Sequence, residues 1–416
     1  MERTKFAGVY TDDGAGTIVV RYSWEQRKFS ELYARSSEKN DGSIGMDKNI
    51  TVATMQFKND VKVSTTEYLK TYYTFKLGDI AFEGHQSKEF RYGRFVENDI
   101  GNGIVSHIFA VFRPIQEYDL CFWKYAINNE TLMQRILARS TKASTMMHDL
   151  VTNDFLKETF LVPSVKEQKQ IGAFLNKLDH LITLHQRKLE KLKLVKKSML
   201  EKMFPKNGSS VPEIRFNGFT DDWEQRKLSH FLDVSSEKNT DNLYTKDDVL
   251  SVSGDFGVIN QIEFQGRSFA GASVSNYGVV HTGDVVYTKS PLKANPYGII
   301  KANKGKTGIV SVLYGVYHTR ENANADFIQM YFEQDTRLNN YLRPLVNKGA
   351  KNTLLISDTD ALEGEVCLAP TFDEQKTIGQ FFDTLDNLIT LHQRKLKKLQ
   401  VSENRCFRRC LFDIII

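Results

Sequence analysis

The sequence predicts an α+β protein in which two tandem domains are separated by two long antiparallel helices that form a coiled coil, with pseudo-twofold symmetry. Three observations predict this fold. The nonapeptide LITLHQRKL occurs twice, from Leu181 and from Leu388, 207 positions apart. A second repeat, WEQRK, begins at Trp24 and at Trp223. The blocks between the repeats contain short alternating stretches rich in β-branched and aromatic residues, as strands do, and internal repeats decide the architecture of a chain.

The repeats extend well beyond the shared nonapeptide. From Pro163 and from Pro370, 20 of 31 aligned residues are identical. We therefore divide the chain into a first domain (1–160), a first repeated helix (161–205), a second domain (206–365, with a linker at 206–222) and a second repeated helix (366–416). The linker is assigned from its Pro, Gly and Ser content.

Each repeat predicts one long helix. No proline interrupts the 38 residues from Glu167 to Phe204, a length of roughly 57 Å at about 1.5 Å per residue. Apolar residues recur at steps of three and four, which favours pairing of the two helices over two independent surface helices. Two equivalent halves associate most simply about a twofold axis, so we expect the helices to be antiparallel. The apolar positions are Ile171, Leu175, Leu178, Ile182, Leu189 and Leu192, and in the second copy Phe382, Leu385, Ile389, Leu396 and Leu399.

The two domains share a framework. KLGDIAFEG at Lys76–Gly84 aligns with HTGDVVYTK at His281–Lys289, at an offset of 205, and Gly103–Pro114 aligns with Gly308–Thr319 at the same offset. All four segments have the composition of strands. One scaffold that carries two sets of loops is how a single fold can recognise two different targets.

Composition narrows the class of protein. A net charge of +5 and a pI near 8.7 permit a polyanionic partner without requiring one. The apolar runs are too short to cross a bilayer, and the first residues have no signal-peptide stretch. The four cysteines form no disulfide framework, and no histidine cluster accompanies Cys406 and Cys410 in a metal-ligand spacing. We expect a cytoplasmic protein with no metal site.

Catalytic motifs are missing from the sequence. It contains no phosphate-binding loop, no HExxH motif and no nucleophile elbow. The segment Asn295-Pro296-Tyr297 resembles part of the motif of amino-methyltransferases, but a proline turn is sufficient to explain it. Asp79 and Glu83 could serve a nuclease, but the second domain keeps only the aspartate. We therefore expect no catalytic residues and no cofactor in this chain.

The loops offer cations, amides and aromatics instead. Lysine suits phosphate contacts, and arginine or asparagine can read base edges, although any single basic loop is usually solvated surface. Such loops recur at matched places in both domains, which favours DNA as their partner. The candidate DNA-binding residues are Lys88, Arg91, Tyr92, Arg94, Lys142, Lys289, Lys293, Lys304, Lys306, Lys348, Lys351 and Asn352.

The repeated motifs resemble those of the specificity subunits of bacterial type I restriction–modification systems. The resemblance rests on the pattern EQ…IG…LD.LI, which includes Glu167, Gln168, Gly172 and Asp179, and on its second copy from Glu374. The WEQRK segments resemble the start of each target-recognition domain in that family. The resemblance covers nearly the whole chain.

That resemblance implies a non-catalytic subunit. Each domain would read one half of a split target in double-stranded DNA. The helices would set the spacing of the two halves and dock two methyltransferase subunits, and restriction subunits would join through the complex. S-adenosylmethionine, ATP and magnesium would belong to those partners, and no membrane is implied. The candidate partner-binding residues are Arg187, Lys188, Lys191, Arg394, Lys395 and Lys398.

Three other hypotheses stay open on the sequence alone. The first is a free-standing sequence-specific DNA-binding regulator with a coiled-coil spacer. The second is a complete nuclease or methyltransferase in one chain, and the third is a purely structural bundle. The segment Gly14–Ser23 interrupts the repeat, because the second half runs from its Asp-Asp pair straight into Trp223. It is expected to be an extra edge strand or a disordered start.

Overall fold

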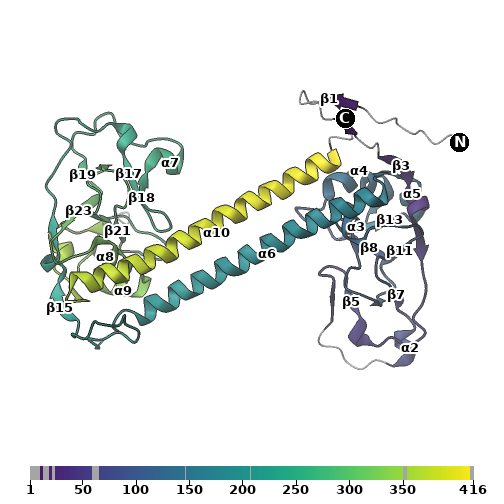
Figure 1. Ribbon diagram of the computed structural model, residues 1–416, viewed down its shortest axis with the longest axis horizontal. Coiled ribbons are helices and arrows are strands. Elements are labelled where there is room, and N and C mark those ends of the chain that lie inside the picture. The colour runs from purple at the N-terminus through teal and green to yellow at the C-terminus, as the bar shows by residue number, and fades with distance from the viewer. Residues whose placement is uncertain are drawn as a thin grey trace. The chain divides into compact units, whose positions relative to one another are not determined.

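The computed structural model describes residues 10–12, 18–20, 24–58, 65–145, 147–206, 208–349 and 354–412, with side chains described except in 10–12, 18–20 and 404–412. The chain divides into two compact units: Met1–His185 with Lys395–Ile416, and Gln186–Arg394. Each unit holds one α+β domain and part of both long helices, α6 (Val165–Lys202) and α10 (Phe372–Phe412), drawn in teal and yellow in Figure 1.

The domain of the first unit is built on a four-stranded antiparallel sheet in the order β4-β11-β8-β9. A two-stranded ladder joins β3, which carries the WEQRK motif, to the last strand, β14. Its elements are β1 (Tyr10–Asp12), β2 (Ile18–Val20), β3 (Glu25–Lys28), α1 (Phe29–Leu32), β4 (Tyr33–Ser36), β5 (Ile50–Thr51), β6 (Gln56–Phe57), α2 (Thr66–Leu69), β7 (Tyr73–Phe75), β8 (Ile80–Glu83), β9 (Arg94–Glu97), β10 (Gly103–Val105), β11 (Ala110–Pro114), α3 (Leu120–Ile127), α4 (Glu130–Ser140), β12 (Thr141–Ala143), β13 (His148–Leu150), α5 (Thr152–Lys157) and β14 (Thr159–Val162).

The domain of the second unit repeats that topology. Its four-stranded sheet has the order β16-β23-β20-β21, and β15 pairs with β26. Its elements are β15 (Glu224–Lys227), β16 (Leu232–Val234), β17 (Leu250–Ser253), β18 (Gly257–Asn260), α7 (Gln261–Gln265), β19 (Gly278–Val280), β20 (Val285–Thr288), β21 (Ile299–Ala302), β22 (Gly308–Val310), β23 (Tyr314–Thr319), α8 (Ala325–Tyr331), α9 (Asp335–Leu342), β24 (Asn347–Lys348), β25 (Leu354–Leu355) and β26 (Glu365–Leu368). Corresponding strands lie in matching positions of the two sheets, so the predicted shared framework is confirmed.

Aromatic side chains fill the core of the first unit. Phe155 stacks on Phe29 with ring centroids 4.4 Å apart, and Trp123 meets Tyr33 edge-on at 5.6 Å. All four rings are at most 2% exposed. Rings of this size bury much apolar area, and their stacked and edge-on contacts add about 0.5–1.5 kcal/mol per pair. The sheet is therefore held tightly on the side that faces helices α3 to α5.

The repeated WEQRK and EQ motifs fasten each long helix to its domain. Trp24 Nε1 donates to Glu167 Oε1 at 3.1 Å, and Trp223 Nε1 donates to Glu374 Oε1 at 3.3 Å. The next residue in the motif, Gln168, is 1% exposed. Its side chain accepts from the backbone amide at the N-cap of α3 and donates to the carbonyl of Pro163, both at 3.0 Å. Buried polar groups are costly unless they are paired, so these residues define how each helix leaves its domain.

The glycine of the same motif permits a close approach between helices. A Cβ atom on Gly172 would lie 2.7 Å from Phe122 N and 2.8 Å from Cys121 Cβ, at the start of α3. In the second unit the contact is looser, because a Cβ on Gly379 would lie 3.1 Å from Asp326 Cβ at the start of α8. Only a residue without a side chain fits the first of these contacts.

The two long helices are antiparallel where they meet in each unit. In the second unit, Lys196 pairs with Asp386 at 2.8 Å, while the later residue Phe204 stacks near the earlier residue Phe382, with centroids 6.1 Å apart. In the first unit, Asp179 of α6 contacts Glu403 of α10. Residues later in α6 thus meet residues earlier in α10, which confirms the predicted pairing.

The segment between the two halves is anchored rather than loose. Arg215 donates to both carboxylate oxygens of Glu374 at 2.6 and 2.8 Å, and Phe216 packs edge-on against Phe381 at 5.8 Å. Its Pro, Gly and Ser content predicted a linker, but gave no sign of this contact with α10. Within the inserted segment of the first half, β2 pairs with β1 in a separate two-stranded sheet, so the segment contains a strand but does not extend the four-stranded sheet of the domain. None of the described helices is both long enough and apolar enough to span a bilayer.

Candidate nucleic-acid interface

In the first domain, the loop after β8 lies against the β12–β13 hairpin. The His148 amide donates to the Gly84 carbonyl at 2.8 Å, and Gln86 Nε2 lies 2.6 Å from His148 Nε2. A Cβ atom on Gly84 would lie 2.1 Å from the carbonyl oxygen of His148, so the contact depends on glycine. Two basic segments that are separate in the sequence, 85–94 and 141–150, therefore form one loop–hairpin surface.

The structure distributes the predicted residues of this surface between exposed and paired positions. Lys88 and Lys142 are exposed, and neither forms an ion pair with a described residue. The Arg91 guanidinium lies 5.5 Å from the centre of the Tyr92 ring. Arg94 is engaged within the domain, 2.8 Å from a carboxylate of β8 and 2.9 Å from a backbone carbonyl. Solvent therefore reaches at least part of Lys88, Lys142, Arg91 and Tyr92, while Arg94 supports the loop.

The second domain builds the matching surface from the loop after β20 and the β24–β25 hairpin. Lys348 Nζ lies 4.9 Å from the centre of the Tyr297 ring, a cation–π contact between hairpin and loop. Tyr287 Oη donates to the Tyr297 carbonyl at 2.6 Å and so fixes the loop on the sheet. Tyr297 follows Tyr92 by the same offset of 205 that relates the strands.

The remaining predicted residues of the second domain differ in their surroundings. Lys293 and Lys306 are exposed, without an ion pair to a described residue. Lys289 pairs with Asp358 at 2.8 Å and is largely buried. Lys304 pairs with Asp326 at 3.1 Å and with a carboxylate of α10, which places it at the starts of α8 and α10, outside the loop–hairpin contacts. Lys351 and Asn352 lie outside the described residues.

Sequence reasoning missed three members of these surfaces. Tyr297 could have been found, because the offset of 205 maps it onto Tyr92. Gln86 and His148 carry no such signal, since their pairing depends on a hairpin that folds back across 62 positions of chain. Hydrogen bonds between loops are set by tertiary structure and leave no periodic pattern.

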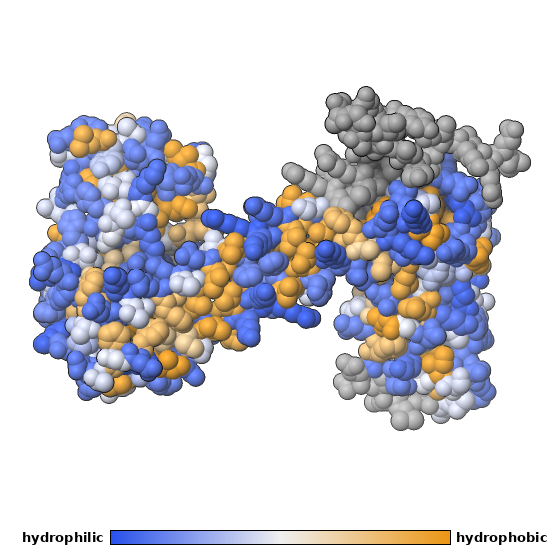
Figure 2. Space-filling view, in the orientation of Figure 1, coloured by the Kyte–Doolittle hydropathy of each residue, from blue (hydrophilic) through white to orange (hydrophobic). Residues whose placement is uncertain are grey.

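Both long helices expose the same face. Leu184 is 38% exposed and Leu391 is 44% exposed, and they are 207 positions apart. Figure 2 shows hydrophilic and hydrophobic residues interleaved over the long helices. On each helix taken separately, we call this leucine and the exposed cations that follow it in the sequence the helical docking surface. Those cations are the predicted partner-binding residues Arg187, Lys188, Lys191, Arg394, Lys395 and Lys398.

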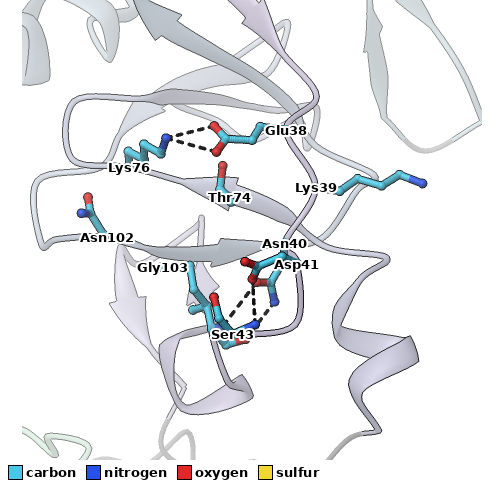
Figure 3. A pocket seen from close by; sticks show the side chains of 10 residues that line it. Glu38, Lys39, Asn40, Asp41, Ser43, Thr74, Lys76, Asn102 and Gly103 are labelled. Atoms are coloured by element: carbon cyan, nitrogen blue, oxygen red, sulfur yellow. Dashed lines mark hydrogen bonds and ion pairs between the residues drawn. The ribbon is translucent and has the colours of Figure 1, made fainter.

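A surface pocket of about 300 Å³ in the first domain is a framework feature (Figure 3). It is lined by the repeated SSEKN segment, in which Glu38 pairs with Lys76 at 3.0 Å. Hydrogen bonds from Arg113 and from Lys76 lower the pKa of Glu38 to about 2. The buried Asn40 donates to a nearby backbone carbonyl at 2.8 Å, as Asn239 does in the second domain. Lys76 and Arg113 thus neutralise the charge of Glu38, and Glu38 and Asn40 of the SSEKN segment have structural roles.

The side chains considered for catalysis are engaged elsewhere. Both carboxylate oxygens of Asp79 accept from Arg113 at 2.9 Å, and Glu83 pairs with Arg94. The amide of Asn295 donates to a carboxylate of α9 at 2.8 Å. Within the part of the chain that the structure describes, no three His, Cys, Asp or Glu residues are grouped so that they could hold a metal ion.

Comparison with known proteins finds relatives in one family. Residues 23–194 match the family model of the type I restriction modification DNA specificity domain. The putative type I restriction enzyme MjaX specificity subunit of Methanocaldococcus jannaschii is 21% identical over 92% of this chain and 91% of its own length. A second specificity subunit of that organism, MjaVIII, is 29% identical over 27% of each chain.

A solved structure has the same fold. The S subunit of a type I restriction–modification system from M. genitalium superposes with a TM-score of 0.53 over 93% of this chain and 95% of that chain, at 14% identity. The HsdS subunit from Thermoanaerobacter tengcongensis superposes with a TM-score of 0.45 over 94% and 96%, at 16% identity. Residues 23–194 thus match the type I restriction modification DNA specificity domain, and the chain is similar over most of its length to a type I restriction enzyme specificity subunit.

Proposed function

We propose that this chain is the DNA sequence-specificity subunit of a type I restriction–modification complex, in which each domain reads one half of a bipartite target. The observation that carries the proposal is the duplication of the loop–hairpin surface. Lys142 and Lys348 occupy matching hairpins, and Tyr92 and Tyr297 occupy matching loops. Two such surfaces on one chain suit two half-sites, because phosphate contacts position a protein on DNA and neighbouring side chains read the bases.

The same residues support a role in DNA recognition without a catalytic role. Arginines hold the carboxylates of Asp79 and Glu83, and the exposed loop residues are cations, amides and aromatics. We propose that methyl transfer and cleavage belong to partner subunits, with their S-adenosylmethionine, ATP and magnesium. A free-standing regulator would need no such partner.

The test of DNA reading is charge reversal in each hairpin of the full-length chain. Lys142→Glu and Lys348→Glu should each weaken binding to duplex DNA at low salt, and the double variant should weaken it more. Each phosphate contact that is lost should reduce the slope of log K against log salt by about 0.9. Lys157→Glu, at the exposed end of α5, makes the same change in net charge and should leave the slope unchanged. An unchanged slope in the double variant would remove the loop–hairpin surface from the proposal.

We further propose that the helical docking surface holds two methyltransferase subunits, one at each copy of the repeat. A leucine that stays about 40% exposed at the same place in both helices, beside lysine and arginine, has the mixed apolar and charged character of a protein interface. Because the repeat presents this face twice, one chain can bind two copies of one partner.

The docking test uses one leucine from each helix. Leu184→Glu or Leu391→Glu alone should reduce the co-purified complex from two methyltransferase subunits to one, as measured by mass in solution, and the double variant should bind none. Leu243→Glu, at a leucine that is 79% exposed in the second domain, is the matched control and should keep both. Full assembly by the double variant would show that the partner docks elsewhere, while leaving DNA reading untouched.

A further inference from the structure

One difference between the two copies of the repeat changes the contact between the long helices. Lys196 of α6 and Glu403 of α10 are 207 positions apart and therefore occupy the same place in the two copies. In the second unit, Lys196 Nζ lies 2.8 Å from Asp386 Oδ1. In the first unit, the counterpart Glu403 is hydrogen-bonded to Asp179, which is itself the counterpart of Asp386. The helix–helix contact is thus an ion pair in the second unit and a pair of carboxyl groups in the first.

We propose that Glu403 and Asp179 form a proton-controlled clasp, which fastens the C-terminal part of α10 to the first unit at low pH and loosens it above neutral pH. Two carboxyl groups can share a hydrogen bond only while one of them carries a proton. When both are ionised, the hydrogen bond is lost and the like charges repel each other.

One oxygen of Asp179 already accepts a hydrogen bond from outside the pair. Tyr125 Oη, from α3, donates to Asp179 Oδ2 at 2.6 Å. Burial, and then the hydrogen bond to Asp179, raise the pKa of Tyr125, so it remains a donor across the neutral range. Burial also raises the pKa of Cys121, the other titratable group of α3 near this place, so its thiol stays neutral. Among the side chains that the structure describes, no lysine or arginine pairs with Asp179 or Glu403.

The sign of the pH dependence follows from this arrangement. Burial, and then the hydrogen bond to Asp179, raise the pKa of Glu403 to about 7. Folding therefore takes up a proton between the ordinary pKa of a glutamate and pH 7. The attachment is complete below that ordinary value and is lost as the pH rises through 7.

The matching joint of the second unit is built from contacts between opposite charges. Besides Asp386, Lys196 lies 3.5 Å from Glu333, which also pairs with the buried Lys301 at 2.5 Å. Contacts of this kind do not need a proton shared between two carboxyl groups, so we expect no such pH dependence there. The repeat thus supplies an internal control for the clasp.

Hydrogen exchange of the full-length chain, read by mass spectrometry, tests the clasp. After correction for intrinsic exchange, protection of the α10 segment around Glu403 should fall about tenfold between about pH 6 and about pH 8, because a group with a pKa of about 7 loses most of its bound proton over this range. Protection of the matching α6 segment around Lys196 should stay constant.

Three variants separate the clasp from a general loss of structure. Glu403→Gln donates to Asp179 at any pH, and Glu403→Lys recreates the ion pair of the second unit, so both should make protection of α10 independent of pH. Lys196→Glu should transfer a pH dependence to the second unit. Wild-type protection that is flat from pH 6 to pH 8, or an unchanged dependence in Glu403→Gln, would overturn the proposal.

Discussion

Adding one methyl group at Gly172 should destabilise the first unit. The Cβ atom of Gly172→Ala would lie 2.5 Å from Asp119 Oδ1, 2.7 Å from Phe122 N and 2.8 Å from Cys121 Cβ. Two of these atoms belong to the rigid start of α3, so the helices must separate. Overpacking of this kind costs about 1–3 kcal/mol, and the gain in helix propensity from glycine to alanine returns up to about 1 kcal/mol. We expect a net loss of about 1–2 kcal/mol.

The second copy of the motif provides the control for this substitution. The Cβ atom of Gly379→Ala would lie 3.1 Å from Asn324 Oδ1, 3.1 Å from Asp326 Cβ and 3.4 Å from Phe327 N, distances that small shifts can accommodate. Its overpacking cost should be close to the gain in propensity, so stability should change by less than about 0.5 kcal/mol. Urea unfolding followed by hydrogen exchange reports each unit separately. Equal effects of the two substitutions would refute the argument from close approach.

Further predictions concern buried carboxylates and the helix length. In calorimetric unfolding, Glu374→Gln should cost the second unit about 3 kcal/mol, because it leaves the largely buried Arg215 without its charge partner. Glu167→Gln, where no described arginine pairs with the carboxylate, should cost less than about 1 kcal/mol in that assay. Glu97 is 2% exposed and neither of its oxygens has a hydrogen-bond partner among the described residues; burial, then the charge of Asp99, raise its pKa. The wild-type first unit should therefore lose stability as the pH rises above the ordinary glutamate value, and Glu97→Gln should be the more stable by about 1–3 kcal/mol at pH 8 but not at pH 4 in urea unfolding; an equal difference at both pH values would contradict this. Four residues inserted after both Leu192 and Leu399 should lengthen each helix by about 6 Å and lengthen the unread spacer with both half-sites unchanged, as mapped from methylated bases in host DNA; new half-sites with the old spacer would contradict it.

The repeats made the architecture predictable from sequence. Nine identical residues at Leu181 and Leu388 pointed to two equivalent helices, and the offset of 205 between strands pointed to two copies of one sheet. Both follow from periodicity and self-similarity, which a single sequence displays directly. The antiparallel pairing needed only the further physical argument that equivalent halves associate about a twofold axis.

The details of the interface were less predictable. Lys304 and Lys142 look alike in the sequence as lysines in polar loops, yet Lys304 is neutralised by Asp326 and a carboxylate of α10, while Lys142 is exposed. The difference lies in which distant segment passes nearby. The exposure of Leu184 could not be predicted for the same reason, since a leucine in a heptad-like stretch is usually assigned to the contact between the two helices.

The closing ladders of the two domains have a consequence for how such chains change. In each domain the strand of the WEQRK motif pairs with the last strand, β3 with β14 and β15 with β26. The points where a domain leaves and rejoins the helical part of the chain are therefore neighbours. A whole block between them could be exchanged for another with the same framework while the repeated helices keep their sequence and their pairing.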